Sequence, residues 1–394
     1  MSERIALGFC NNVDYEILWD SEVLEDLVHD YRIRHDDLKE RGAIQTERDL
    51  VVSILGFMQA GAGGERFVSD SILIERFASR FNKKITLGGT SVRAAIAMRK
   101  LGYTSALHLI TQNQQARERI PADCPYVCSN AQDSFFPHLI VQYGAGDRVR
   151  AGELDIRARQ PNRLIYHCNA DRIAMKLNPD FADLLAGAQV LLISGFNAMQ
   201  SKRLLLERLA TLSRMLERLP SDATVYLEDG GYYDPSFRRL IYRALGPRID
   251  VYGLNEDELQ THLERKVELG DARHTRIALD ELRQRIPAAA IVLHTRSWAL
   301  AHGERASQYE AALRSAVTLA TTRFCYGDDF RLAHYRQIES RAPSADIKRF
   351  ADAINSAPGD KLFCVPVPQV RQDKATTVGL GDAFVGGFLP ALLA

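Results

Sequence analysis

The sequence has no excess of charge of either sign and no long apolar run. Its 394 residues contain 50 Lys and Arg against 50 Asp and Glu. This balance argues against a protein built around nucleic acid or an anionic membrane, although it allows a local basic pocket. No stretch approaches the roughly 18 apolar residues that span a bilayer, and residues 1–17 lack the apolar core of a signal peptide. We therefore expect a soluble, cytoplasmic protein with no nucleic-acid or membrane partner.

Cysteine is also scarce, and two familiar site patterns are missing. The chain has 6 cysteines, too few and too scattered for a disulfide framework, so we expect reduced thiols. Cys124 and Cys128 flank a proline, but no second Cys or His pair follows at the spacing of a zinc site. No Gly-x-Gly-x-x-Gly follows an early strand with an acid about 20 residues on, which argues against a dinucleotide-binding oxidoreductase.

The second half of the chain alternates short apolar runs with helical patterns. Residues 188–196 form such a run, and leucines at helical spacing follow in 201–220. Similar runs, each followed by polar or glycine-rich residues, occupy 224–231, 248–259, 289–295 and 362–368. This alternation predicts an α/β domain whose parallel sheet is covered on both faces. Ligands of such sheets bind at the carboxyl ends of the strands, so we expect the functional site there.

The first part of the chain is less regular. Residues 85–103 predict a strand, a tight glycine turn and a helix, with Thr90 or Ser91 as N-cap. The segments 11–75 and 107–184 hold shorter apolar stretches and many turn residues. We interpret them as excursions from the main sheet that form a lid.

The strongest local motif lies in residues 375–389, where Gly379-Leu380-Gly381 opens a helix and Asp382 follows at once. Two glycines let backbone N–H groups approach an anion, and the helix N-terminus adds positive potential. The motif therefore indicates a cradle for phosphate. Asp382 in the first turn could accept a proton from an attacking hydroxyl. The alternative is a glycine turn in which Asp382 only begins a helix.

A second motif follows the strand expected near residue 250, where Asn255 and Glu258 are three residues apart. Asn at the N-cap with Glu at the third helical position is a capping arrangement, in which each side chain bonds the other's backbone N–H. At the carboxyl end of a strand, Glu258 could also organise the water shell of a phosphate-bound magnesium ion. The residues alone leave both interpretations open.

Together these motifs resemble the ADP-dependent glucokinase/phosphofructokinase family of the ribokinase-like superfamily. The resemblance rests first on Asn255-x-x-Glu258 followed by Thr377-Val378-Gly379-Leu380-Gly381-Asp382. Further matches, in the family's order, are Asn12-Val13-Asp14, Gly88-Gly89, His138-Leu139-Ile140, Asn162-Arg163-Leu164-Ile165, Ile193-Ser194-Gly195-Phe196 and His294-Thr295. The agreement in order and spacing is more specific than any single motif.

The resemblance implies a fold and an activity. The fold is a three-layer α/β/α ribokinase-like large domain, formed by 1–10, 76–106 and 185–394, with a smaller α+β lid from 11–75 and 107–184. The activity is transfer of the β-phosphoryl group of ADP to a sugar hydroxyl, with Mg²⁺ or another divalent cation, giving AMP and a sugar phosphate. Nothing in the glycine turn distinguishes ADP from ATP. Two alternatives therefore remain, which are an ATP-dependent sugar or nucleoside kinase and a non-catalytic sugar- or nucleotide-binding regulator. We expect the protein to be a monomer or a small homo-oligomer.

The resemblance also implies roles for residues around the phosphates. Asp382 is the expected base, and Gly379, Leu380 and Gly381 are the expected anion hole. The expected nucleotide-binding residues are Asn255, His294, Thr295, Val378, Gly379 and Gly381, and the expected metal residues are Glu228, Glu258 and Asp382. The family has His-x-Glu where this chain has Tyr226-Leu227-Glu228, so the carboxylate is kept and the His is lost.

The expected sugar site has one feature that favours glucose and one departure from the family. By resemblance its residues are Asn12, Asp14, Glu65, Gly88, Gly89, Thr90 and Arg163. Glu65 matches a glucose-binding acid of the glucokinase members, which favours glucose with fructose 6-phosphate second. Thr90 stands where the family usually has Asn.

Several cationic and histidine side chains complete the candidates. Arg93, Arg163, Arg172 and Lys176 could clamp a sugar phosphate, with surface positions as the alternative. We expect His138 and His167 to be packed histidines, because Asp382 already serves as the base.

Overall fold

The large domain is built on a nine-stranded sheet. The computed structural model describes residues 3–39, 42–286, 288–357, 359–371 and 376–393. The strand order is β16-β15-β14-β13-β12-β11-β1-β5-β6, and all neighbours from β14 to β6 are parallel, whereas β15 and β16 are antiparallel. The strands are β1 (Ile5–Gly8), β5 (Ala106–Leu109), β6 (Tyr126–Cys128), β11 (Val190–Ile193), β12 (Thr224–Glu228), β13 (Val251–Asn255), β14 (Ala290–His294), β15 (Trp298–Gly303) and β16 (Leu362–Pro366).

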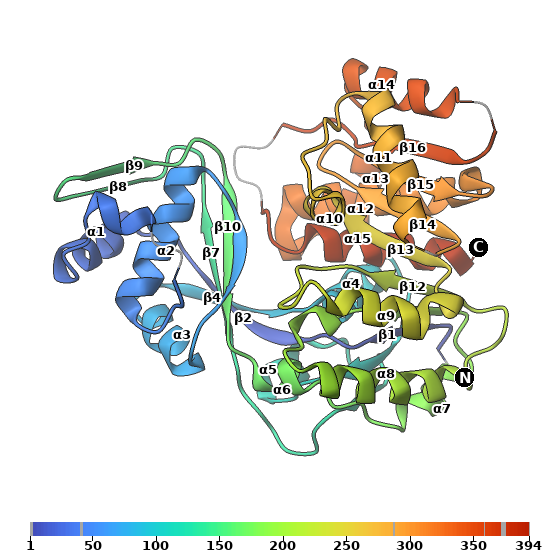
Figure 1. The fold of residues 1–394 in the computed structure, drawn as a ribbon, viewed down its shortest axis with the longest axis horizontal. Helices are drawn as coiled ribbons and strands as arrows, with labels where there is room; N and C mark the ends of the chain where they lie inside the picture. Colours follow the sequence, from blue (N-terminus) through green and yellow to red (C-terminus); the bar gives the residue numbers. More distant parts are fainter. Residues whose placement is uncertain (1–2, 40–41, 287, 358, 372–375, 394) are drawn as a thin grey trace.

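Helices cover both faces of this sheet (Figure 1). One face packs against α4 (Thr90–Arg99), α5 (Gln114–Arg119), α12 (Glu310–Tyr326) and α15 (Leu380–Phe388). The other face packs against α7 (Phe181–Leu185), α8 (Lys202–Leu216), α9 (Phe237–Leu245), α10 (Glu256–Leu263), α11 (Ala272–Arg285) and α14 (Ala345–Asn355). Helix α13 (Leu332–Glu339) packs on α12, and α6 (Ala170–Ala174) lies beside residues 196–198. The expected three layers are therefore present.

The apolar pattern explains these layers. All four residues of β11 are buried, because the strand lies between two helical layers. In α8 the buried residues include Leu205, Leu209 and Leu212, at spacings that place them on one helix face. The six cysteines are free thiols, and none of the described helices is long and apolar enough to cross a membrane.

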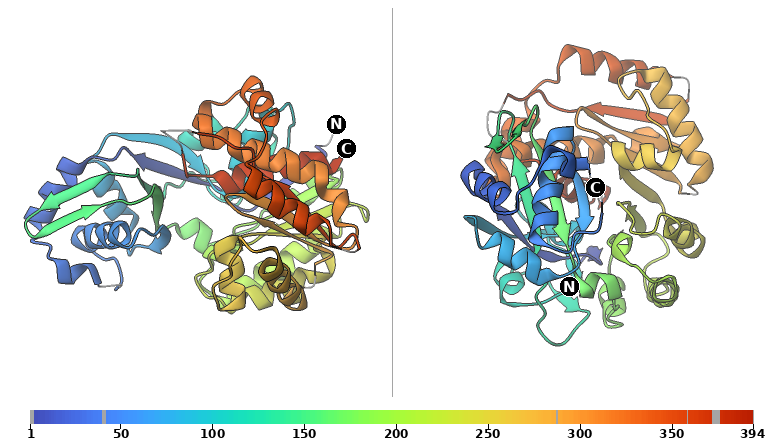
Figure 2. Two further views of the ribbon diagram at one scale, coloured as in Figure 1. Left: turned by 90° about the horizontal axis from the view of Figure 1, so that it is seen from above. Right: turned by 60° about the vertical axis from the view of Figure 1, so that its left-hand side comes forward.

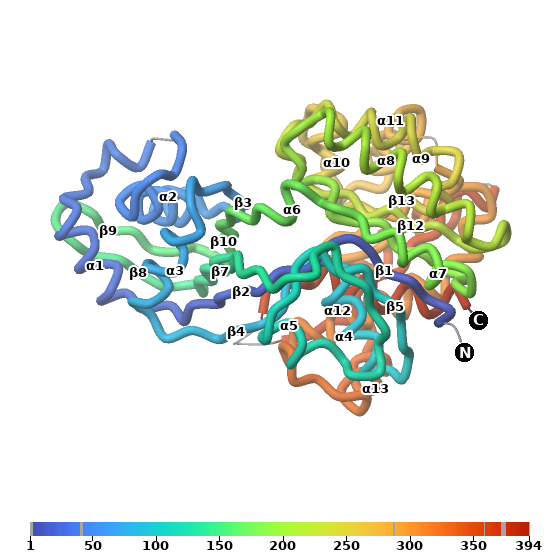
Figure 3. Tube along the Cα trace, turned by 90° about the horizontal axis from the view of Figure 1, so that it is seen from below, coloured from blue at the N-terminus to red at the C-terminus, as the bar shows by residue number. Residues whose placement is uncertain are grey.

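A smaller domain lies to one side (Figures 1 and 2). Its five-stranded sheet has the order β3-β10-β7-β2-β4, and the hairpin of β8 and β9 forms a separate two-stranded sheet. These strands are β2 (Asn12–Ile17), β3 (Gly64–Phe67), β4 (Lys83–Gly88), β7 (His138–Tyr143), β8 (Arg148–Ala151), β9 (Leu154–Arg157) and β10 (Asn162–His167). Helices α1 (Ser21–Asp30), α2 (Glu47–Ala60) and α3 (Ser71–Ala78) complete its own hydrophobic core. The trace shows β2 and β4 connecting the two domains (Figure 3).

Three strands belong to a different sheet from the one that the expected boundaries gave them. Strand β4, expected in the large domain, pairs antiparallel with β2 in the small sheet, and α3 before it packs into the small core. Strands β5 and β6, which lie almost wholly in the segment expected to form the lid, extend the large sheet. The helix expected to be capped by Thr90 or Ser91 has Gly89 as its N-cap instead, and Ser91 donates a hydrogen bond to the Cys10 carbonyl. Local sequence patterns predict individual strands and helices, whereas the sheet that a strand joins depends on partner strands that are distant in the sequence.

Helix α15 begins at a turn that only glycine fits well. Gly379 is its N-cap and adopts φ 67°, in the left-handed region. A Cβ at Gly379 would lie 2.9 Å from Arg93 Nη1 and 3.1 Å from Arg323 Nε. Both the backbone conformation and the two guanidinium groups therefore require glycine there.

We predict that Gly379→Ala destabilises the protein by about 1–2 kcal/mol, because it forces an L-residue into left-handed backbone. Gly381→Ala is the matched control, since its Cβ would lie 3.5 Å from His294 Cε1, an ordinary contact. Its free energy of unfolding should stay within about 0.5 kcal/mol of the unsubstituted protein. Urea unfolding of the two variants measures the difference, and equal losses would contradict the assignment of strain to Gly379.

Candidate active site

The carboxyl ends of three parallel strands meet the N-terminus of α15. Asn255 at the end of β13 pairs in register with His294 at the end of β14, and Glu228 ends β12 beside them. The His294 ring stacks on Phe384 of α15 with centroids 4.6 Å apart. Its Nε2 lies 3.3 Å from Glu228 Oε1. The expected nucleotide and metal residues are therefore assembled next to the glycine turn.

Asp382 lies in the first turn of α15 with its side chain 21% exposed. Within the described residues no side chain caps this helix, so its first N–H groups lack the usual partner. Backbone N–H groups and the helix dipole together favour an anion at this end. The turn of Gly379, Leu380 and Gly381 thus has the geometry of an anion site, with a carboxylate beside it.

Asn255 and Glu258 form the capping arrangement that the sequence allows. Asn255 Oδ1 accepts hydrogen bonds from the N–H groups of Asp257 (2.8 Å) and Glu258 (3.1 Å). In return, Glu258 Oε2 accepts one from the Asn255 N–H at 2.8 Å. Burial raises the pKa of Glu258 well above its usual range, and the nearby Asp229 and Glu228 add to the rise. The cap therefore leaves a buried acid facing other acids.

The residues next to this acid cluster have structural roles of their own. Tyr226, in the place of the family's His, is fully buried, and a Cβ at Gly253 would overlap its hydroxyl. Burial raises its pKa well above the usual value, with a further contribution from Glu228. Thr295 Oγ1 donates to the Trp298 carbonyl at 2.8 Å and so closes the turn between β14 and β15. A nucleotide contact of Thr295 stays a prediction.

The expected sugar residues gather where β2 and β4 leave the large domain. Asn12 on β2 is the register partner of Gly88 on β4, and its side chain donates to Asp14. A Cβ at Gly88 would overlap both the Asn12 amide and the Asp14 carboxylate, which explains the glycine. Thr90 begins α4 beside them and is half-buried.

Arg93 connects this group to the glycine turn at the start of α15. The guanidinium is 6% exposed, and its Nη2 lies 2.8 Å from Asp14 Oδ2 and 3.2 Å from Glu16 Oε1. On its other side, Arg93 Nε lies 3.8 Å from Asp382 Oδ2. Burial raises the pKa of Asp14 to about 6 although Arg93 opposes the rise, and the charges of Glu16 and Asp382 add to it.

The small domain contributes Glu65 from β3. Its Oε1 lies 2.8 Å from His167 Nε2, and its side chain is 36% exposed. Desolvation alone would raise the pKa of Glu65, but His167, with Arg172 and Arg163, lowers it to about 2. The His167 ring stacks on His138 at 4.8 Å, and His138 Nδ1 lies 4.0 Å from Asp14 Oδ1. The two histidines are packed, as expected, and they link Glu65 to Asp14.

Two arginines that sequence reasoning left as surface alternatives are buried. Arg93 is 6% exposed, and Arg172 on α6 is 7% exposed, with an Nε that has no hydrogen-bond partner within the described residues. Desolvation lowers the pKa of Arg172, but Cys10, Glu65, Asp14 and Asp382 together raise it above its usual value. The surface alternative is therefore wrong for Arg93 and Arg172. Arg163 and Lys176 are exposed.

Sequence reasoning missed Arg323 on α12. It is buried, and its Nε donates to the Val378 carbonyl at 2.9 Å, directly before the glycine turn. An arginine within an otherwise small and apolar helix face was the available signal.

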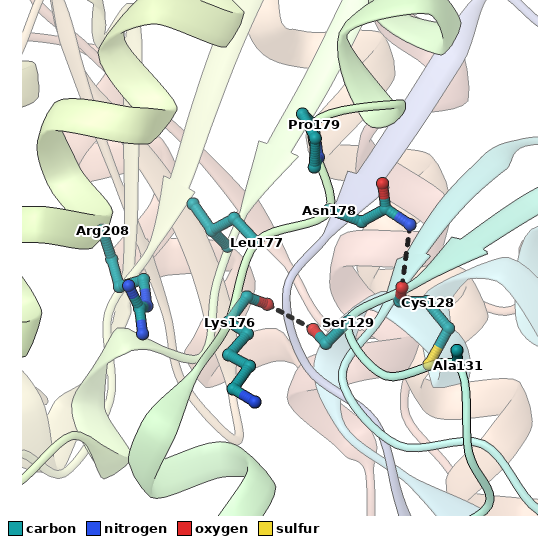
Figure 4. Close-up of a pocket in the computed structure, with 8 residues that line it drawn as sticks. All are labelled: Cys128, Ser129, Ala131, Lys176, Leu177, Asn178, Pro179 and Arg208. Atoms are coloured by element: carbon teal, nitrogen blue, oxygen red, sulfur yellow. Dashed lines mark hydrogen bonds between the residues drawn. The ribbon is translucent and has the colours of Figure 1, made fainter.

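A cavity of about 560 Å³ lies apart from these residues, between the end of β6 and the segment 176–179 (Figure 4). Lys176 and Arg208 line it, together with Cys128, but the residues expected to bind sugar or nucleotide do not. Lys176 therefore lines a cavity away from Asp14 and Asp382, and we do not assign it to the group of residues around them.

Comparison with known proteins shows which family this chain is similar to. The family model described as ADP-specific phosphofructokinase/glucokinase conserved region matches residues 3–389. An ADP-dependent glucokinase from Bos taurus is 26% identical over 234 residues, which are 56% of this chain and 46% of that protein. The chain therefore spans about half the length of this curated relative.

Solved structures share the fold at low identity. A phosphofructokinase from Pyrococcus horikoshii OT3 with AMP has a TM-score of 0.76 at 16% identity, covering 100% of this chain and 98% of that one. An ADP-dependent kinase complexed with fructose-6-phosphate and ADPbetaS has a TM-score of 0.72 at 13% identity, covering 99% and 94%. These likenesses confirm the α/β fold with its smaller second domain. Because the family model matches nearly the whole chain, this protein belongs to the ADP-specific phosphofructokinase/glucokinase family.

Proposed function

We propose that the protein is an ADP-dependent sugar kinase that transfers the β-phosphoryl group of ADP to a sugar hydroxyl. The observation that carries the proposal is the position of Arg93, which lies 2.8 Å from Asp14 and 3.8 Å from Asp382. The anion site at α15 and the carboxylate of the expected sugar site therefore border one cleft. A phosphate donor and a polyol acceptor can meet there.

In the proposed reaction Asp382 accepts the proton of the sugar hydroxyl while the hydroxyl oxygen attacks the β-phosphorus. The bond from that phosphorus to the oxygen bridging to the α-phosphate breaks, and AMP leaves. The N–H groups of Gly379, Leu380 and Gly381 stabilise the charge that develops on the transferring group. Arg172 is a buried cation whose Nε has no partner among the residues that the structure describes, and it adds positive charge near Asp14 and Asp382.

The acid cluster fits a divalent cation shared with the phosphates. Glu228 Oε2 is buried without a partner in the described residues, and the pKa of Glu258 is raised by burial and by its acidic neighbours. The described residues contain no group of three His, Cys, Asp or Glu side chains that could hold a metal. Mg²⁺ usually keeps several waters and takes one or two carboxylates with substrate phosphates. We propose Glu228 and Glu258 as those carboxylates, with Asp382 nearby. When bound, the ion would neutralise phosphate charge.

Glucose is the favoured acceptor, with fructose 6-phosphate second. Glu65 supports this order because a carboxylate with a pKa of about 2 is ionised at neutral pH and accepts hydroxyl hydrogen bonds. The same charge repels a sugar phosphate placed against it. The exposed Arg163 and the buried Arg172 lie near enough to lower the pKa of Glu65, and they provide the opposing attraction for a phosphate. A cytoplasmic location and the oligomeric state stay predictions.

An assay of product nucleotide over a panel of free and phosphorylated sugars, with magnesium, tests this function. We expect AMP from ADP, and no comparable turnover with ATP. Asp382→Asn should lower kcat by about 10³-fold or more, because the proton acceptor is lost, while ADP affinity by calorimetry changes little. Binding without AMP formation from any sugar would favour the regulator, and unaltered turnover of Asp382→Asn would exclude this residue as the base.

Glu65→Ala should change the acceptor preference. We expect kcat/KM for glucose to fall by about 100-fold, because a hydrogen-bond acceptor for the sugar is lost. We expect kcat/KM for fructose 6-phosphate to fall less, because removing the Glu65 carboxylate also removes its repulsion of the sugar's phosphate. Competition between the two sugars in one assay measures the ratio, and an unchanged ratio would show that Glu65 does not choose the acceptor.

Arg93→Met should move the acidic limb of the pH profile for sugar use. Arg93 holds down the pKa of Asp14, which is already raised to about 6. Without the guanidinium the Asp14 carboxyl stays protonated to higher pH, so the limb of kcat/KM for the sugar shifts upward by roughly one unit. Arg93→Lys keeps the charge and should shift the limb less. Thermal unfolding checks that both variants fold, and a limb that stays in place in folded, active Arg93→Met would contradict the pairing.

A further inference from the structure

The catalytic turn is held from outside the cleft by Arg323. This side chain is 7% exposed and donates from Nε to the Val378 carbonyl at 2.9 Å. The carbonyl of Val378 and the N–H of Gly379 belong to one planar peptide and point in opposite directions. A bond that fixes the carbonyl therefore also fixes the direction of the Gly379 N–H, a donor of the proposed anion site.

Arg323 is in turn tied to the small domain. Its Nη1 pairs with Asp328, which follows α12. Asp328 Oδ2 also lies 3.0 Å from Lys84 Nζ on β4, the strand that pairs with β2 in the small sheet. Burial alone would raise the pKa of Asp328, but Arg323, Arg93 and Lys84 lower it below its usual value. The Asp328 carboxylate therefore stays ionised between Arg323 and Lys84.

A second contact from the small domain reaches the same turn independently. Gln142 on β7 accepts a hydrogen bond at Oε1 from the Thr377 N–H at 3.3 Å. The small domain thus contacts the residues directly before Gly379 through Gln142, and it also reaches the Val378 carbonyl from β4 through Asp328 and Arg323.

We propose that Lys84, Asp328 and Arg323 form a relay by which the small domain sets the direction of the Gly379 N–H, with Arg323 and Asp328 as positioning residues. The inference rests on the proposed function, because it assigns that N–H to the transferring phosphoryl group. The links differ in strength. Arg323 is buried and the Asp328 side chain is 29% exposed, whereas Lys84 is 51% exposed, and an exposed ion pair contributes little.

Steady-state kinetics test the relay, with Asp329→Asn as the matched control because Asp329 is adjacent to Asp328 and exposed. Arg323→Met should lower kcat by about 100-fold, since small misplacement of a catalytic donor has effects of this order. KM for the sugar should change less than about threefold. Asp328→Asn should lower kcat about 10-fold and Lys84→Met only about twofold. Arg323→Lys should recover part of kcat, and Asp329→Asn should leave kcat unchanged.

A double-mutant comparison separates a relay from independent effects. If Asp328 acts through Arg323, the variant carrying both Arg323→Met and Asp328→Asn should lose no more kcat than Arg323→Met alone. Multiplied losses would overturn the relay. So would a raised KM at unchanged kcat, or a loss in Asp329→Asn equal to that in Asp328→Asn.

Hydrogen exchange provides a readout that does not need activity. Amide exchange measured by mass spectrometry in peptides covering residues 378–382 should be several-fold faster in Asp328→Asn than in Asp329→Asn, at equal thermal stability. Equal exchange rates in the two variants would overturn the relay. If the unsubstituted protein forms no AMP with any sugar, the proposed function fails, and exchange still decides whether Asp328 holds the turn.

Discussion

The site depends on the ion pairs that the buried guanidinium of Arg93 forms with neighbouring carboxylates. The guanidinium balances Asp14 and Glu16 from one strand and approaches Asp382 from another part of the chain. Burial disfavours the charged form of Asp14 and raises its pKa to about 6, and Arg93 opposes this rise. Removing one member of such a cluster leaves an uncompensated buried charge, which is strongly unfavourable. The cluster therefore fixes these side chains relative to one another, and its arginine favours an ionised Asp14.

The same arginine constrains the backbone around it. Gly379 has room for no side chain, because Arg93 and Arg323 lie on either side of it. Gly88 is excluded from carrying one by Asn12 and Asp14. The glycines of the two motifs thus share one cause, which is the close approach of polar side chains to the backbone. At Gly379 the left-handed backbone is a second cause.

Much of the large domain could be predicted from its sequence, because parallel strands such as β11 are apolar throughout and helices such as α8 show a clear stripe. The sheet to which β4 belongs could not be predicted. Its alternation of polar and apolar residues fits either sheet, and only its pairing with β2 places it in the small one. In the site, Asp382 and Asn255 could be found from their motifs. Arg323 could not, and Arg172 is only one of four candidate cations, because a sequence does not show which arginines lose their solvent. The role of Arg323 depends on Val378, which is more than fifty residues away.

The cap at Asn255 shows why a structural and a functional interpretation need not compete. The cap uses one oxygen of Glu258 and fixes the side chain at the carboxyl end of a strand. The remaining carboxylate charge is buried beside Glu228 and Asp229, which raises the free energy of the ionised form. A cap on an exposed helix would carry no such penalty, because water would solvate the acid. Asp229 is paired with Arg238 at 3.4 Å and with His262 at 2.8 Å. The capping arrangement therefore supplies the rigidity, and under the proposed function a divalent cation would offset the remaining charge of Glu228 and Glu258.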